Sequence, residues 1–95
     1  MSQDNDAGPL SGLKVLDFTQ FLAGPYATMI LADLGAEVIK IETPAGELAR
    51  HLPPHFVGKD SLYYLSVNRN KKSLAVDLKT ENGKKVVQEL MDGCD

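Results

Sequence analysis

The chain has 95 residues, which is enough for one small domain or for part of a larger one. With 43% hydrophobic and 24% charged residues, its composition is typical of a globular α/β protein. The net charge of -3 argues against non-specific nucleic-acid binding, and no apolar run approaches the roughly 18 residues that span a bilayer.

The beginning of the chain and its one cysteine bear on location. Residues 1–8 are polar and acidic, so we expect a flexible N-terminus and neither a secretory signal nor a transit peptide. The single cysteine, Cys94, cannot form an internal disulfide, which is typical of proteins in the reducing cytoplasm. We therefore expect a cytoplasmic protein that binds neither nucleic acid nor membrane.

The first half of the chain predicts a strand, a helix and a second strand. Residues 14–18 form a short apolar run, residues 26–34 have helical spacing, and residues 37–42 are again strand-like. Pro25 suits the first helical position, and Gly35 is the expected C′ residue of the helix. This is a βαβ unit. The buried stripe of its helix is expected to comprise Tyr26, Met29, Ile30 and Leu34.

The second half predicts a long loop followed by a strand and a helix. Residues 43–60 show no period, and residues 61–67 could be a helical turn or a short strand. A basic turn over residues 68–73 leads into a strand at 73–78, and Thr80 is a good N-cap for a last helix. Together these patterns predict an α/β fold with a mainly parallel sheet. The apolar face of the last helix is expected to comprise Val86, Val87, Leu90 and Met91.

The turn at residues 20–25 is the first candidate ligand site. Ligands of βαβ units bind where the carboxyl end of a strand meets the start of a helix. Ala23 and Gly24 are small enough for a ligand to approach the backbone, and a helix starting at Pro25 offers unpaired N–H groups to phosphate. The alternative is that Gly24 and Pro25 form only a tight turn.

Several familiar sites are not supported. The chain has neither the glycine pattern of dinucleotide-binding turns nor that of a P-loop, and no serine sits in a nucleophile elbow. His51 and His55 are four residues apart, but Pro53 and Pro54 between them prevent the helix that would align the two imidazoles. We therefore expect no metal site.

A basic set is the second candidate site. Lys79 follows the last predicted strand, and the turn before that strand is also basic, so these cations could hold the phosphate groups of a large cofactor. The alternative is a charged loop that faces only water. The set comprises Arg69, Lys71, Lys72 and Lys79.

Two long blocks of sequence resemble the family III CoA-transferases, also called the CaiB/BaiF family. The first block runs from PLSGLKVLDFT at residues 9–19 through AGP at 23–25 to LADLGAEVIKIE at 31–42. The second is NRNKKSLAVDLK at residues 68–79. Because both blocks occur in register, residues 9–95 are expected to be the N-terminal, incomplete part of that family's Rossmann-like large domain.

The resemblance also implies an activity and a set of contacts. Members of the family move CoA between an acyl-CoA thioester and a free carboxylic acid through a covalent aspartyl intermediate, as interlocked homodimers. CoA or acyl-CoA is then the substrate, without a metal. The catalytic aspartate is expected outside this chain. The implied cofactor-binding residues are Gln20, Phe21, Leu22 and Ala23 in the turn after the first strand, and Val76 and Lys79 at the end of the third.

Three alternatives stay open at this stage. A 2-methylacyl-CoA racemase of the same superfamily would have its acid and base downstream. The chain could also be a non-catalytic CoA-binding module or an inactive fragment.

Some transferases have a histidine where Gln20 stands and a glutamine where Leu22 stands, which leaves the acyl specificity open. Asp17 lies within the first strand and is interpreted as structural.

Overall fold

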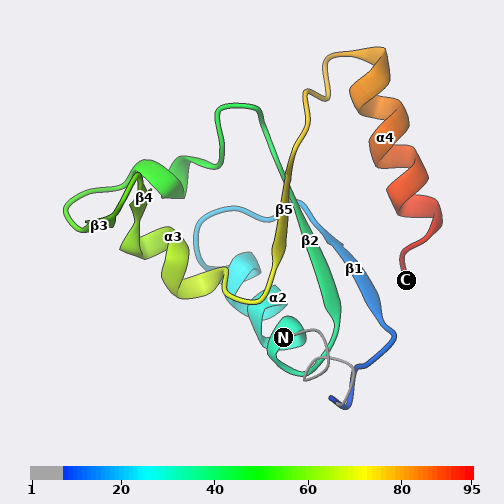
Figure 1. Cartoon of the computed structure of the whole chain (residues 1–95), viewed down its shortest axis with the longest axis horizontal. Coiled ribbons are helices and arrows are strands. Elements are labelled where there is room, and N and C mark those ends of the chain that lie inside the picture. The colour runs from blue at the N-terminus through cyan, green and yellow to red at the C-terminus, as the bar shows by residue number, and fades with distance from the viewer. Residues whose placement is uncertain (1–7) are drawn as a thin grey trace.

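The computed structural model describes residues 8–95, so the expectation of a flexible segment at residues 1–8 falls outside it except for Gly8. Its centre is a parallel sheet of three strands in the order β1-β2-β5 (Figure 1). The strands are β1 (Lys14–Asp17), β2 (Glu37–Glu42) and β5 (Lys72–Ala75). The predicted α/β fold with a mainly parallel sheet is confirmed.

The predicted βαβ unit is present, with α2 (Ala23–Asp33) joining β1 to β2. Gly35 follows the helix with a φ of 111°, a conformation that glycine adopts without a Cβ clash. Asp17 at the end of β1 pairs with Lys40 of β2, and Glu42 at the end of β2 pairs with Ala75 at the end of β5. The three strands therefore end along one edge of the sheet.

Helices cover the sheet on both faces, as the crossing connections of parallel strands require. On one face Val38 of β2 packs with Ala32 of α2. On the other face Ile41 packs with Val76 and with Val87 of α4 (Glu81–Asp92). Figure 1 shows α4 separated from α2 by the sheet. None of the helices within residues 8–95 is long and apolar enough to cross a membrane.

The predicted buried stripe of α2 is wrong apart from Met29. The helix begins at Ala23 rather than at Pro25, and it buries Pro25, Met29 and Ala32. The start of the helix lies very close to the turn that precedes it, where a Cβ on Gly24 would be 2.5 Å from Thr19 Cβ. The larger apolar side chains point outward, with exposed fractions of 53% for Tyr26, 42% for Ile30 and 41% for Leu34.

The segment between β2 and β5 is more regular than its sequence suggests. It contains a 3-10 turn η1 (Leu48–His51) and a small antiparallel hairpin of β3 (Phe56–Val57) and β4 (Asp60–Ser61). The stretch at residues 61–67, for which the sequence predicts either a helical turn or a short strand, contains a helix, α3 (Leu62–Val67). Ser61 caps α3 by accepting the Tyr63 N–H at 3.1 Å, a local preference of serine that fixes where this helix starts.

The last strand is shorter than predicted and begins earlier. β5 spans Lys72–Ala75 instead of 73–78, and the Val76 N–H makes the last bond to β2, to the Glu42 carbonyl at 2.8 Å. The chain then turns, because the Asp77 carboxylate accepts the Lys79 N–H at 2.9 Å and its carbonyl accepts the Thr80 N–H. Such a local Asp bond competes with strand pairing.

The helix α4 starts as predicted, with Thr80 Oγ1 accepting the Gly83 N–H at 3.0 Å. Its buried face is narrower than predicted, because Val87 and Leu90 pack on the sheet whereas Val86 and Met91 are 41% and 51% exposed. The first turn of α4 lies directly on the chain that leaves β5.

Gly83 is required by this close approach. A Cβ at Gly83 would lie 2.0 Å from the Asp77 carbonyl oxygen. In an open helix Gly→Ala stabilises by up to about 1 kcal/mol, but we expect Gly83→Ala to lower the free energy of unfolding by ~1–3 kcal/mol through overpacking. Urea unfolding measures the change. Gly93→Ala, whose Cβ would make an ordinary 3.8 Å contact, is the control, and equal stability of the two variants would contradict the prediction.

Candidate functional site

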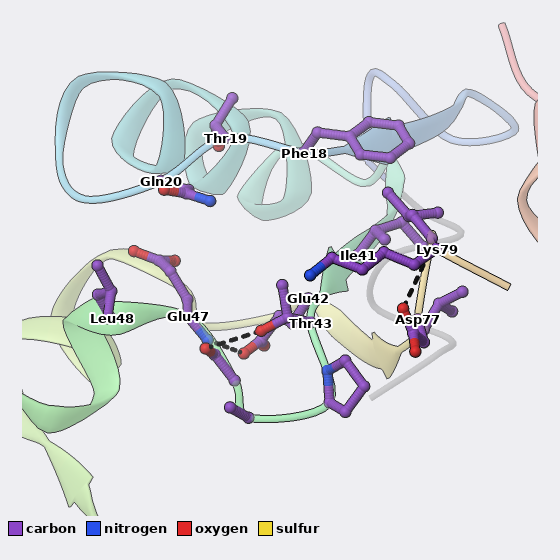
Figure 2. A pocket seen from close by; sticks show the side chains of 15 residues that line it. Phe18, Thr19, Gln20, Ile41, Glu42, Thr43, Glu47, Leu48, Asp77 and Lys79 are labelled. Atoms are coloured by element: carbon purple, nitrogen blue, oxygen red, sulfur yellow. Dashed lines mark hydrogen bonds between the residues drawn. The ribbon is translucent and has the colours of Figure 1, made fainter. Parts of the chain in front are cut away.

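A pocket lies where the three strands end (Figure 2). Its volume is about 690 Å³. Three segments enclose it: residues 18–20 after β1, residues 41–48 at and after the end of β2, and residues 76–79 after β5. The carboxyl edge of a parallel sheet is the usual ligand site of such folds, and a volume of this size is within the range of small-molecule sites.

Half of the predicted cofactor-binding residues line this pocket. They are Gln20 from the segment after β1, and Val76 and Lys79 from the segment after β5. Figure 2 shows Gln20 and Glu47 facing each other at one end, and the Lys79 side chain extending over Ile41 at the other. The other predicted residues do not line the pocket. They are Phe21, Leu22 and Ala23, which form the exposed turn and the first residue of α2.

The predicted basic set does not form one site. Arg69 pairs with Asp33 at 2.7 Å and Lys72 with Glu37 at 2.6 Å, both on exposed surfaces. The set's remaining turn residue, Lys71, has a buried side chain that pairs with Asp17 at 3.0 Å. Lys79 alone among the four lines the pocket, and it forms no ion pair with any residue in 8–95. It is therefore the candidate for binding an anion there.

Asp17 anchors the start of the turn that forms one wall of the pocket. Its carboxylate accepts the Thr19 N–H at 2.7 Å, the Thr28 hydroxyl at 2.7 Å and Lys71 Nζ at 3.0 Å. Burial by itself would raise the pKa of Asp17, but these hydrogen bonds outweigh it and hold the pKa below its usual value. Burial lowers the pKa of Lys71. The interpretation of Asp17 as structural agrees with this geometry.

A second buried pair joins two walls of the pocket. Lys40 Nζ lies 2.7 Å from Glu47 Oε1, and the two side chains are 1% and 2% exposed. Lys40 also donates to the Thr19 carbonyl at 2.8 Å, and Glu47 Oε2 accepts the Phe21 N–H at 2.6 Å. The turn after β1 is thus bonded to β2 and to the loop that follows it.

Glu42 is the centre of a third group, at the end of β2. Arg50 binds its carboxylate with two nitrogens, at 2.7 and 2.8 Å, and Tyr64 Oη donates to it at 2.7 Å. Ser73 Oγ and the Glu47 N–H donate as well, at 2.7 and 2.8 Å. Burial would raise the pKa of Glu42, but these donors hold it far below its usual value. The same carboxylate raises the pKa of Arg50.

The sequence carries one signal for these groups. Lys40 and Glu42 alternate with Ile39 and Ile41 in β2, which resembles a strand with one face in water. In a parallel sheet covered on both faces, charged residues in that pattern must instead be buried and paired. The partners Glu47 and Arg50 belong to the loop that the sequence left without structure.

The histidines and the cysteine lie apart from the pocket. Within residues 8–95 no three His, Cys, Asp or Glu side chains gather in a way that could hold a metal ion. His51 and His55 do not line the pocket, and Cys94 lies beside β1 near the end of α4. Asp77 does line it, with its carboxylate accepting the Lys79 N–H.

Comparison with known proteins decides the family. Residues 10–95 match the sequence pattern described as CoA-transferase family III. The chain belongs to this family. It is 58% identical over 95 residues to the human succinyl-CoA:glutarate CoA-transferase, covering 99% of this chain and 22% of that protein. A probable fatty acyl-CoA transferase of Mycobacterium tuberculosis is 50% identical over 97 residues, covering 100% of this chain and 25% of that protein.

A solved structure agrees with the family assignment. A CaiB/BaiF family protein from Brucella suis superimposes with a TM-score of 0.87 at 39% identity, over 93% of this chain and 24% of that one. The chain therefore spans about a quarter or less of the relatives it matches. All three parallel strands and the pocket at their carboxyl ends fall within the shared part, since they lie in residues 10–95.

The Glu42 group predicts a dependence of stability on pH. The pKa of Glu42 is depressed in the folded state from a usual value of 4.5, so its contribution is present above that value and is lost as pH falls towards the folded pKa. Between pH 4 and pH 3 the free energy of unfolding of the wild type should fall more steeply than that of Glu42→Gln, by about 1.4 kcal/mol per pH unit. Urea unfolding across this range measures both slopes.

The exposed Glu89 of α4 provides the control. Glu89→Gln removes a carboxylate without touching the buried group, and it should keep the wild-type slope. Parallel slopes for the wild type and Glu42→Gln would show that Glu42 is not held ionised by its partners.

Proposed function

We propose that the full-length protein transfers CoA between an acyl-CoA thioester and a free carboxylic acid, and that this chain supplies part of the CoA-binding site. The observation that carries the proposal is the pocket at the carboxyl edge of the sheet, which is lined by Gln20, Val76 and Lys79 among others. Membership of CoA-transferase family III supports the reaction class. The transferases among its relatives favour transfer over racemisation.

The chemistry of the pocket suits the nucleotide end of CoA. Ile41 and Val76 provide apolar surface at the base of the pocket, which an adenine ring can cover. Lys79 is exposed at its mouth, where a flexible ammonium group can pair with phosphate. In this proposal the exposed turn residues Phe21, Leu22 and Ala23 contact the ligand outside the pocket itself.

Within residues 8–95 three carboxylates line the pocket, those of Glu42, Glu47 and Asp77. The Asp77 carboxylate accepts the Lys79 N–H, and the resemblance to the family leads us to expect the catalytic aspartate outside this chain. Glu42 and Glu47 are buried and bound to cations, so attack on a thioester by either would break its ion pair. We therefore place the reacting aspartate in another part of the full-length protein. That carboxylate would attack the thioester carbonyl, CoA would leave as the thiolate, and the resulting acyl anhydride would carry the acyl group.

Two further expectations belong to the proposal. The interlocked homodimer comes from the resemblance to the family, and the cytoplasmic location rests on the single cysteine among these 95 residues. No metal is required by the proposed reaction, because the carboxylate nucleophile and the thiol leaving group need no Lewis acid.

Lys79 provides a direct test of the pocket. Lys79→Ala should raise the Kd of the full-length protein for CoA about tenfold, the amount expected for losing one charge-assisted contact to phosphate. Pantetheine lacks the nucleotide and should bind both proteins equally. Calorimetric titration measures these constants. Lys59→Ala, in the exposed turn between β3 and β4, is the control, and equal CoA affinity of all three proteins would remove Lys79 from the site.

The transfer reaction is tested with succinyl-CoA as donor. Glutarate is the first acceptor to try, because succinyl-CoA and glutarate are named for the human relative. We expect the full-length protein to exchange CoA with at least one acid of a panel of short mono- and dicarboxylates. Residues 1–95 alone should give no exchange, because the proposed nucleophile lies elsewhere. Exchange by that piece would contradict the assignment of the nucleophile.

A further inference from the structure

One buried ion pair holds the backbone on both sides of Gln20. Lys40 Nζ donates to the Thr19 carbonyl at 2.8 Å, and Glu47 Oε2 accepts the Phe21 N–H at 2.6 Å. The ammonium and carboxylate contact each other at 2.7 Å, with 1% and 2% of their side chains exposed. Gln20, the residue between the two bonded peptide groups, lines the pocket together with Phe18 and Thr19.

Phe21 has a conformation that requires such support. Its φ is 66°, in the left-handed region that residues other than glycine rarely occupy. Its side chain is 39% exposed, so packing holds it only in part. Residues in this region persist where surrounding contacts over-determine them. The hydrogen bond from the Phe21 N–H to Glu47 is one such contact.

Glu47 belongs to the opposite wall of the pocket. It lies in the loop after β2, and its own N–H donates to Glu42 Oε1 at 2.8 Å. Figure 2 shows Glu47 directly across from Gln20, with its bond to Glu42 beneath. A single side chain thus joins the turn after β1 to the loop after β2, and it sets how far apart the two walls lie.

We propose that Lys40 and Glu47 are positioning residues for CoA binding: they hold the Gln20 turn so that the pocket is formed before the ligand arrives. The inference rests on the proposed function, since CoA is the ligand proposed for this pocket. A preformed site binds more tightly because ordering is not left to the binding step. Stability alone does not explain the pair, since apolar residues of similar volume often serve a fold equally well.

Two double variants separate positioning from stability. Lys40→Met with Glu47→Leu replaces both charges by apolar side chains and removes the acceptor of the Phe21 N–H. Lys40→Met with Glu47→Gln also removes both charges, but it keeps a side-chain oxygen where Glu47 Oε2 stood. Neither variant leaves a buried charge unpaired. They differ at a single residue, in whether that side chain can accept the Phe21 N–H.

The measurements are made on the full-length protein. We call the protein with Lys40→Met and Glu47→Leu the Leu variant, and the protein with Lys40→Met and Glu47→Gln the Gln variant. We expect the Leu variant to bind CoA about tenfold more weakly than the Gln variant, at similar midpoints of thermal unfolding. Amide hydrogen exchange at Phe21 should be faster in the Leu variant and remain slow in the Gln variant, while exchange within β2 is alike in both. If the Leu variant does not fold, the Gln variant against wild type tests the Lys40 bond to Thr19 in the same assays.

A matched pair at the other end of the sheet is the control. Lys72 and Glu37, at the starts of β5 and β2, pair at 2.6 Å and do not line the pocket. Lys72→Met with Glu37→Leu should leave CoA affinity and Phe21 exchange unchanged. Equal CoA affinity of the Leu and Gln variants overturns the inference alone, provided that Lys79→Ala still weakens binding. If Lys79→Ala has no effect either, the proposed function of the pocket fails with it.

Discussion

Charged side chains buried at the carboxyl edge of the sheet determine where the connecting segments around the pocket lie. Asp17, Lys40 and Glu42 stand at or near the ends of β1 and β2, and each is at most 5% exposed. A buried charge that loses its partner costs several kcal/mol, typically ~3–5. Each of these residues therefore ties a partner from elsewhere in the chain to the end of a strand. The partners are Lys71, Glu47 and Arg50.

Those partners determine the path of the connecting segments. Glu47 and Arg50 lie in the stretch after β2, where Leu48, Phe56 and Val57 are exposed. The two ion pairs bring the first part of this stretch back over the strand ends. Arg50 also donates hydrogen bonds to Asp60 and to Tyr64, so the hairpin and α3 are attached to the Glu42 group as well. The pocket is the space that remains between segments whose positions the buried charges have already decided.

The sequence predicted what depends on local pattern and missed what depends on the path of the loops. Helical and strand periods with Gly35 between them gave the βαβ unit, and Thr80 gave the start of α4. The buried face of α2 was predicted only at Met29, because the helix buries Pro25 and Ala32 and leaves the larger Tyr26, Ile30 and Leu34 exposed. Gln20 and Lys79 follow strands and were predicted, whereas Glu47 acquires its role only when a distant loop returns to Lys40.

This arrangement separates residues that can change singly from residues that cannot. Gln20 and Lys79 are exposed at the rim of the pocket, where a substitution usually costs within about 0.5 kcal/mol of stability. Lys40 and Glu47 lie below the rim, and replacing one of them leaves the other as a buried charge without a partner. The rim of the pocket can therefore change one residue at a time while the buried pairs stay as they are. Changes in the buried layer must come in pairs, because only a joint replacement leaves no charge without a partner.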